Sequence, residues 1–250
     1  MIPNIKQLAC LAALLTLCAP AGAAEPLSDR LEGDAGMASY TQSSQFVNGT
    51  SHTQALPYTY FDYGRLFARI DTFGIKTVPL LHGYVEIKTT VRQDGYRLTL
   101  PVTGNIRDRR DSVPLGIGTL QETPYGDFFL DLYHDTGASK GNLFDGLYAA
   151  ELDTRIGTLY PQVGIEYLSG SYTGYYYGVS AGEAGNTAAY SPTSSTALLA
   201  GGMLELHLTG DWYGNLYWRR KWADHSIGNS PIVAKSYQDT YFASVAYRFQ

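Results

Sequence analysis

Residues with the functional groups of a serine hydrolase occur at two places in this chain. His134 is followed directly by Asp135 and shortly afterwards by Ser139, and His207 and Ser244 lie on strand faces predicted to point inward. Such groups could activate a serine for acyl transfer if nucleophile, base and orienting group came within hydrogen-bond reach. Nothing in their spacing forces that approach, so the sequence predicts no enzyme and no catalytic residues.

Metal and thiol chemistry are not predicted either. The five histidines lack the paired spacing of metal ligands, at positions 52, 82, 134, 207 and 225. Both cysteines, Cys10 and Cys18, lie within the first 23 residues, so a disulfide framework in the rest of the chain is excluded. No cofactor is therefore expected.

The first 23 residues have the features of a cleaved export signal. Lys6 precedes the apolar stretch Leu8–Cys18, which is too short to span a bilayer, and Ala21-Gly22-Ala23 offers a small-residue cleavage site. Removal of residues 1–23 would leave a net charge of about −6, from 17 basic and 23 acidic residues, without a basic patch. Nucleic acid is therefore not an expected partner. Residues 24–250 are predicted to form one domain.

Most of this domain shows the period-two alternation of strands with one apolar and one polar face. In the segment 82–92, one face carries Val85, Ile87, Thr89 and Val91, and the other carries Tyr84, Glu86, Lys88, Thr90 and Arg92. The apolar faces have no obvious second layer to pack against. A closed barrel resolves this problem if the apolar side chains face lipid and the polar ones face inward. A soluble β-sandwich, in which the 82–92 and 238–249 strands pack on each other, is the alternative.

The predicted fold class is all-β, a transmembrane antiparallel up-and-down β-barrel of about twelve strands, with ten as the alternative. Short turns alternate with long polar connections at 103–111, 135–142, 170–196 and 224–237, as in outer-membrane barrels. If both termini are periplasmic, the strand number is even. The expected strands are 36–46, 56–63, 65–73, 82–92, 95–102, 113–121, 126–135, 144–156, 159–169, 197–209, 212–222 and 238–249.

Charged residues of both signs fall on the predicted inward faces. In a lumen this narrow an unpaired charge is costly, so opposite charges are expected to pair and fill the interior. A slim solute pathway, with rings of charge that set its selectivity, is the alternative. The candidate lumen charges are Arg69, Asp71, Glu86, Lys88, Arg92, Asp131, Glu151, Asp153, Arg155, Glu166, Glu205, Arg219, Lys221 and Arg248.

Several segments resemble the MipA/OmpV family of outer-membrane proteins. They are Asp111–Gly118 (DSVPLGIG), Tyr160–Tyr167 (YPQVGIEY), Tyr175–Ser180 (YYYGVS) with Glu183, Asn229–Val233 (NSPIV), the closing Tyr247-Arg248-Phe249 and, more loosely, Tyr60–Phe67 (YFDYGRLF). The resemblance implies an outer-membrane β-barrel. The best-known member of that family is described as a scaffold that links a lytic murein transglycosylase to a penicillin-binding murein synthase. No catalytic residue set is associated with the family.

Pattern and resemblance together predict a structural or scaffolding protein of a Gram-negative outer membrane. Its expected partners are outer-membrane lipid and, by resemblance alone, a periplasmic murein hydrolase or synthase. A small porin-like channel for small solutes is the alternative function.

Overall fold

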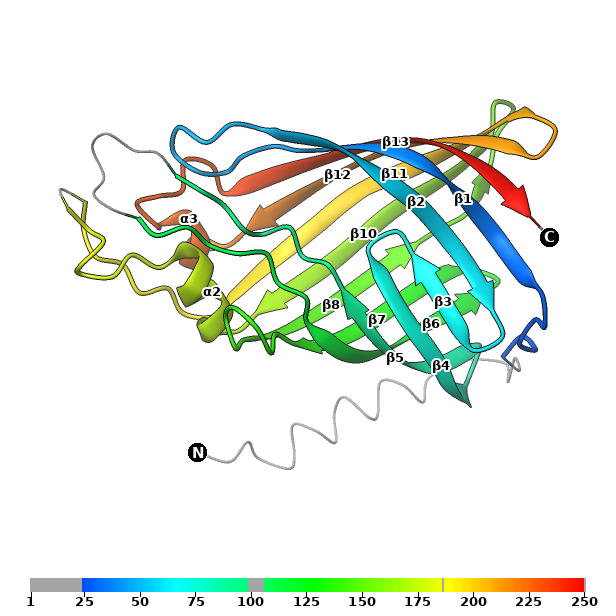
Figure 1. Cartoon of the computed structure of the whole chain (residues 1–250), viewed down its shortest axis with the longest axis horizontal. Helices are drawn as coiled ribbons and strands as arrows, with labels where there is room; N and C mark the ends of the chain where they lie inside the picture. Colours follow the sequence, from blue (N-terminus) through cyan, green and yellow to red (C-terminus); the bar gives the residue numbers. More distant parts are fainter. Residues whose placement is uncertain (1–23, 99–105, 186, 250) are drawn as a thin grey trace.

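The computed structural model describes residues 24–98, 106–185 and 187–249, which form one antiparallel β-sheet closed into a barrel (Figure 1). Strands that follow one another in the chain are neighbours in the sheet. The first strand, β1 (Leu31–Gln42), pairs with the last, β13 (Tyr237–Phe249), and this pairing completes the ring. A closed sheet accounts for apolar faces without a second layer, so the β-sandwich alternative is wrong.

The barrel has twelve strands when the interrupted pair β8 and β9 is counted as one. The remaining strands are β2 (His52–Tyr63), β3 (Leu66–Arg69), β4 (Thr72–Leu80), β5 (Gly83–Thr90), β6 (Leu115–Thr123), β7 (Gly126–His134), β8 (Asn142–Ala149), β9 (Leu152–Asp153), β10 (Thr158–Leu168), β11 (Ser195–Thr209) and β12 (Trp212–Ala223). Two short helices, α2 (Gly170–Tyr177) and α3 (His225–Gly228), lie in the connections. Neither helix is long and apolar enough to cross a membrane.

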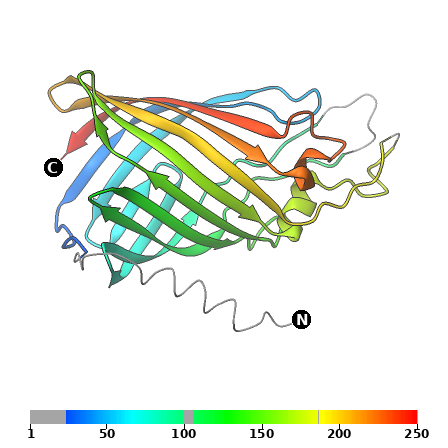
Figure 2. The ribbon, with the colours of Figure 1, turned by 180° about the vertical axis from the view of Figure 1, so that it is seen from behind.

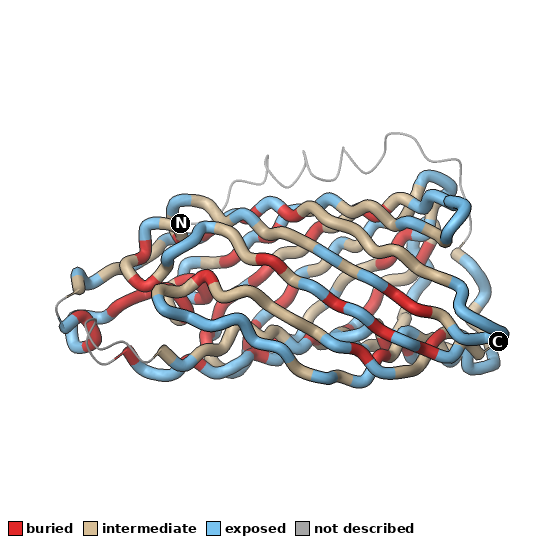
Figure 3. Tube along the Cα trace, turned by 90° about the horizontal axis from the view of Figure 1, so that it is seen from above, coloured by how far each residue is buried: buried red, intermediate tan, exposed pale blue. Residues whose placement is uncertain are grey.

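The two faces of each strand have different surroundings, as the alternation predicted. On β5 the carboxylate of Glu86 and the ammonium of Lys88 are buried inside the barrel, whereas Ile87 between them is 52% exposed on the outside. Buried and exposed positions alternate in this way along the wall (Figure 3). The interior is therefore polar and the outer surface is apolar.

Apart from the short β3–β4 turn at 70–71, which lies part-way along the wall, the connections divide into two kinds that lie at opposite ends of the barrel (Figures 1 and 2). Short turns at 64–65, 81–82, 124–125, 154–157 and 210–211 lie at the end that also holds the start of β1 and the end of β13, which we call the turn end. The long connections 43–51, 91–114, 135–141, 169–194 and 224–236 lie at the other end, the loop end. This asymmetry agrees with the predicted alternation of short and long links.

The strand number was predicted correctly, but two individual strands were not. The predicted strand 65–73 ends early, because the chain turns at Ile70-Asp71 and returns as β4, which the sequence reading missed. Ile70 occupies the left-handed region with φ 54°, a conformation that β-branched residues rarely adopt, so the pattern contains no turn signal there. Conversely, no described residue of the predicted strand 95–102 lies in a strand of the barrel. Tyr96 forms an isolated bridge with Arg109, and residues 99–102 lie outside the described part of the chain.

Candidate functional site

Ion pairs cross the barrel interior near the loop end. Glu166 on β10 binds both Arg92, just after β5, and the Nζ of Lys221 on β12 at 3.1 Å. Arg92 also contacts Asp145 at 3.2 Å and Asp94 at 3.4 Å. These five residues, the loop-side cluster, tie together strands that are far apart in the ring. Glu166 is buried, and its two cations and their hydrogen bonds offset the cost of desolvating its carboxylate.

A second group of ion pairs fills the interior closer to the turn end. Lys88 binds Glu86 at 2.9 Å and Asp131 at 2.5 Å, and all three side chains are mostly buried. Asp62 contacts Lys76 at 3.1 Å and Arg69 at 3.5 Å, and Arg69 lies 4.0 Å from Glu86. We call this group of Asp62, Arg69, Lys76, Glu86, Lys88 and Asp131 the turn-side cluster.

Two of the remaining candidate charges meet near the barrel seam. Arg248 on β13 binds Asp34 of β1 at 2.8 Å and Glu205 of β11 at 2.7 Å, and its guanidinium lies 3.8 Å from the ring centroid of Tyr213. Arg248 thus links three strands around the closure of the ring. The pairing also stabilises the contact between the first and last strands.

Five of the predicted lumen charges form no ion pair among the described residues. Glu151, Asp153 and Arg155 are exposed around the turn that leads into β10, at the turn end. Asp71, in the β3–β4 turn, and Arg219, on β12, both line an internal cavity of about 410 Å³. The structure therefore brings nine candidates into the three ion-pair groups and leaves these five outside them.

Five charged residues that take part in these groups were not predicted from the sequence. They are Asp34, Asp62, Lys76, Asp94 and Asp145. The alternation could have identified Asp145. It lies an even number of residues from Glu151 in the strand predicted at 144–156, so both residues belong to the same face. Asp34 precedes the first predicted strand and Lys76 lies on the missed strand β4, so neither had a face assigned.

The serine and histidine pairs do not form catalytic arrangements. His134 hydrogen-bonds Asn142 at 2.7 Å, while the hydroxyl of Ser139 donates to Asp135 at 2.6 Å. Asp135 also accepts from the backbone amide groups of Gly137 and Ser139 and thereby orders the β7–β8 loop.

The second pair is equally separated. His207 contacts the carbonyl oxygen of Gly210 at 2.8 Å, and Ser244 accepts from Asn215 at 3.0 Å. Neither serine is hydrogen-bonded to its histidine. Within residues 24–98, 106–185 and 187–249, no three His, Cys, Asp or Glu side chains are grouped as a metal site would require.

A compact cap of aromatic side chains covers the loop end of the barrel. Tyr172, Tyr176 and Tyr177 of α2 are buried against Leu143, Leu168 and Ile227, which come from β8, β10 and α3. Tyr172 is 0% exposed, and its hydroxyl donates to Asp94 of the loop-side cluster at 2.6 Å. We call the connections 169–194 and 224–236 with their two helices the cap. The cap and the lumen charges are thus joined by a direct hydrogen bond.

Glu183 is the main electrostatic contact between the cap and the neighbouring connection 91–114. Its carboxylate accepts from Arg107 at 3.1 Å, from Arg109 at 3.0 Å and from the hydroxyl of Ser180 at 2.7 Å. Burial favours the neutral form, but these hydrogen bonds outweigh it and hold the pKa of Glu183 well below its ordinary value. Glu183 therefore stays charged and keeps Arg109 in place.

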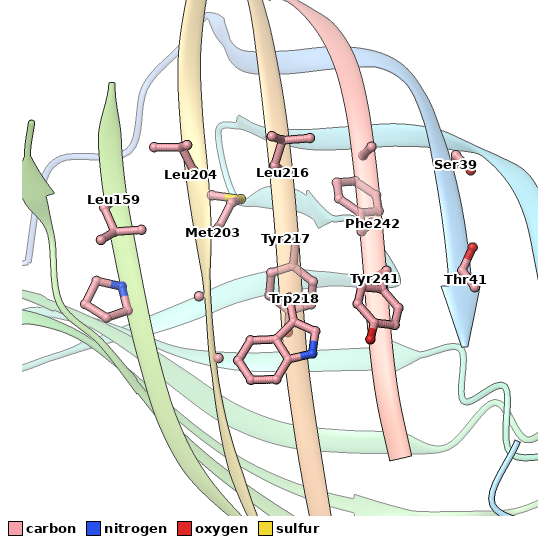
Figure 4. Close-up of a pocket in the computed structure, with 14 residues that line it drawn as sticks. Ser39, Thr41, Leu159, Met203, Leu204, Leu216, Tyr217, Trp218, Tyr241 and Phe242 are labelled. Carbon is pink, nitrogen blue, oxygen red and sulfur yellow. The ribbon is translucent and has the colours of Figure 1, made fainter. Parts of the chain in front are cut away.

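The outer wall carries an apolar depression of about 630 Å³ (Figure 4). Its lining includes Leu159, Leu204, Trp218 and Tyr241 together with Gly202. Its lining contains no ionisable carboxylate, amine or imidazole. It is part of the apolar outer surface rather than a site for chemistry.

Comparison with known proteins decides the family. The family model described as MltA-interacting protein MipA matches residues 35–249, which is nearly the whole described barrel. This chain belongs to the MipA family. Proteins named MltA-interacting protein from Escherichia coli (strain K12) and Shigella flexneri are each 26% identical to it over 150 residues. Each alignment covers 58% of this chain and 60% of the relative's length.

In this MipA-family barrel, several segments that carry the sequence resemblance meet in and around the cap. Tyr175–Ser180 forms the end of α2 and the chain that follows it, and Glu183 binds the arginines of the 91–114 connection. Asn229–Val233 packs beside them, since the hydroxyl of Ser230 donates to the carbonyl oxygen of Tyr177 at 2.6 Å and Ile232 is fully buried. In the sequence these segments lie in separate predicted connections, and the fold brings them together.

The charge of Glu183 is expected to make the cap sensitive to acid. The pKa of Glu183 is lower in the folded protein than in the unfolded chain, so its charge stabilises the cap. This stabilisation is complete above about pH 4.3, the usual pKa of Glu, and is lost as the pH falls through the folded-state pKa. Glu183→Gln should remove about 1–3 kcal/mol of cap stability at pH 7, because Arg109 loses its anionic partner. Limited proteolysis within 169–194, at pH 7 and at acid pH, measures both effects.

Glu151→Gln is the matched control, since Glu151 is exposed and forms no ion pair among the described residues. Equal cleavage of Glu183→Gln and wild-type protein at pH 7 would contradict the assigned role of Glu183.

Proposed function

We propose that this chain is an outer-membrane barrel that serves as a structural scaffold for a murein-remodelling enzyme. Placement in a membrane is supported by the apolar outer surface, on which Ile87, Leu132, Val163 and Leu198 are each more than half exposed. So much apolar surface around a whole barrel exceeds what soluble monomers expose, and lipid would cover it. The turn end would then face the periplasm, as in bacterial outer-membrane barrels.

The filled interior is the observation that favours a scaffold over a channel. The turn-side and loop-side clusters cross the lumen at two levels, and the aromatic cap covers the loop end. An ion that entered would have to displace paired charges in a confined space. A barrel of this kind offers a rigid platform with a periplasmic face. The cavity of about 410 Å³ supports the second candidate, a narrow solute path.

The proposed partner follows from the name of the relatives, which describes them as MltA-interacting. For this chain we propose an MltA-type lytic transglycosylase as partner, bound at the turn end. The turn after β9 offers an exposed contact point there, with Ile156 at 71% exposure beside the exposed cation of Arg155. An apolar group beside a charge on a rigid hairpin suits recognition by a protein partner.

Binding of the partner to the barrel in lipid nanodiscs tests this function. We expect saturable binding of the purified transglycosylase, measured by surface plasmon resonance, and a loss of at least tenfold in affinity for Arg155→Ala combined with Ile156→Ser. Arg155 forms no ion pair among the described residues and Ile156 is exposed, so the double substitution should leave the barrel intact.

Arg97→Ala, an exposed substitution at the loop end, is the control and should bind normally. Absence of binding to the folded barrel would contradict the scaffold role. A steady, ion-selective conductance in planar bilayers that Arg219→Ala alters would make the channel the primary function instead.

A further inference from the structure

The wall of the barrel has a lateral opening above the short β3–β4 hairpin. β2 pairs with β3 only from Tyr60 to Tyr63, and the last contact is the hydrogen bond from the amide of Ile70 to the carbonyl oxygen of Thr59. Beyond it, residues 52–58 have no strand partner on that side among the described residues. The next chain around the ring there is 91–94, which continues from β5 (Figure 1). We call this gap the window.

The residues around the window are suited to an unpaired position. Pro57 lies two residues from Thr59, so its backbone nitrogen points toward the same unpaired edge of β2. Proline has no amide hydrogen to donate, and strands tolerate it at such an edge. Ile70, Phe73 and Val91 are partly exposed and make the rim apolar. A hydrogen bond of 2.6 Å between the side chains of Gln54 and Gln93 bounds the window toward the loop end.

The window leads into the internal cavity of about 410 Å³. The lining of this cavity includes Pro57 and Phe73 from the rim as well as Asp71, Glu166 and Arg219 from the interior. Residues of the rim and residues of the interior therefore line one continuous cavity. The cap adjoins it through the hydrogen bond of Tyr172 with Asp94, and the turn-side cluster adjoins it through Asp131. The window is thus a lateral route to the interior.

Two opposite charges in this cavity, Asp71 and Arg219, form no ion pair among the described residues. The carboxylate of Asp71 accepts a hydrogen bond from the hydroxyl of the adjacent Thr72, and the guanidinium of Arg219 lies 5.9 Å from the ring centroid of Tyr217. The other charged side chains that line the cavity are Arg92, Asp94, Asp131, Asp145, Glu166 and Lys221, and each has an ion-pair partner in the two clusters. A ligand with a single charge could pair with only one of these two groups. A zwitterion would satisfy both.

We propose that the window binds a zwitterionic phospholipid, with its chains in the bilayer and its headgroup in the cavity. The phosphate contacts Arg219 and the ammonium contacts Asp71, while the apolar rim at Phe73 and Val91 packs against the glycerol and the upper part of the chains. Arginine is well suited to phosphate because its guanidinium donates several hydrogen bonds in one plane. This inference rests on the proposed membrane placement of the barrel.

Native mass spectrometry of the refolded residues 24–250 tests the site. In a detergent that is not a phospholipid, we expect one lysophosphatidylethanolamine to be retained per barrel, at least tenfold more tightly than lysophosphatidylglycerol. Arg219→Met and Asp71→Asn should each weaken retention at least tenfold, and Arg219→Lys should restore part of it. Glu151→Gln is the control and should leave retention unchanged.

The other outcomes overturn the proposal. Equal retention of both lipids, or retention unaffected by Arg219→Met, would mean that the lipid binds only to the outer surface, because Arg219 lies inside the wall. Equally tight binding of free phosphoethanolamine would mean a site for a soluble zwitterion. Heat-modifiable gel mobility and insertion into vesicles, measured on the same samples, distinguish failure of this site from failure of the membrane placement.

Discussion

Glu166→Ala is expected to lower the free energy of unfolding of the barrel by about 3–5 kcal/mol. The substitution leaves Lys221 without its ionic partner and removes one of the three anions that surround Arg92. Both cations would then remain inside a confined lumen without full compensation. Urea unfolding of the refolded protein in lipid vesicles, followed by tryptophan fluorescence, measures the change.

Glu151→Ala is the matched control, because it removes a carboxylate that is exposed at the turn end. It should change the free energy of unfolding by less than about 0.5 kcal/mol. A comparably small effect of Glu166→Ala would mean that water solvates the lumen charges freely. That outcome would contradict the filled interior and favour the channel.

Tyr172→Ala is expected to release the cap from the barrel. Tyr172 is fully buried at the centre of the aromatic cluster, and loss of its ring should destabilise cap docking by about 3–5 kcal/mol. Tyr172→Phe keeps the ring but removes the hydrogen bond to Asp94, which should cost about 1.5–3 kcal/mol. Hydrogen exchange of the amides in α2 and in residues 178–185 reports cap opening directly.

Tyr125→Ala removes a tyrosine that is 78% exposed in a turn at the opposite end, so cap exchange should not change. Unchanged protection of α2 in Tyr172→Ala would show that Ile227 and Leu168 hold the cap without it. Comparison of the Ala and Phe variants separates packing from the contact with the lumen charges.

The candidate site was predictable only in part, as its charges illustrate. The alternation of polar and apolar residues predicted that Glu166 and Lys221 face the barrel interior. Nothing in the sequence indicated that they would meet each other and Arg92. Their contact spans 74 and 55 positions in the chain, and it depends on how the closed ring brings distant strands face to face. The alternation also does not describe the residues after β8, because the chain leaves the regular strand at Ala150 and Glu151 is exposed.

The cap was the part of the molecule that local sequence signals could least predict. Residues 170–177 (GSYTGYYY) contain two glycines and four tyrosines, a composition that disfavours a helix in isolation. The helix forms because Tyr172 and Tyr176, four residues apart, face one buried cluster, where their ring centroids lie 4.7 Å apart. Tertiary burial therefore overrides weak local propensity at this position.

The sequence alone was sufficient to predict the barrel, because period-two alternation and the lengths of the connections are local properties that any pairing of the strands must satisfy. It also determined which side chains of a regular strand, such as Glu86 and Ile87, face inward or outward. The pairing of the charges, the docking of the cap and the opening of the wall beside the β3–β4 hairpin became visible only in the folded barrel. These features depend on contacts between residues far apart in the chain, whose geometry exists only once the ring has closed.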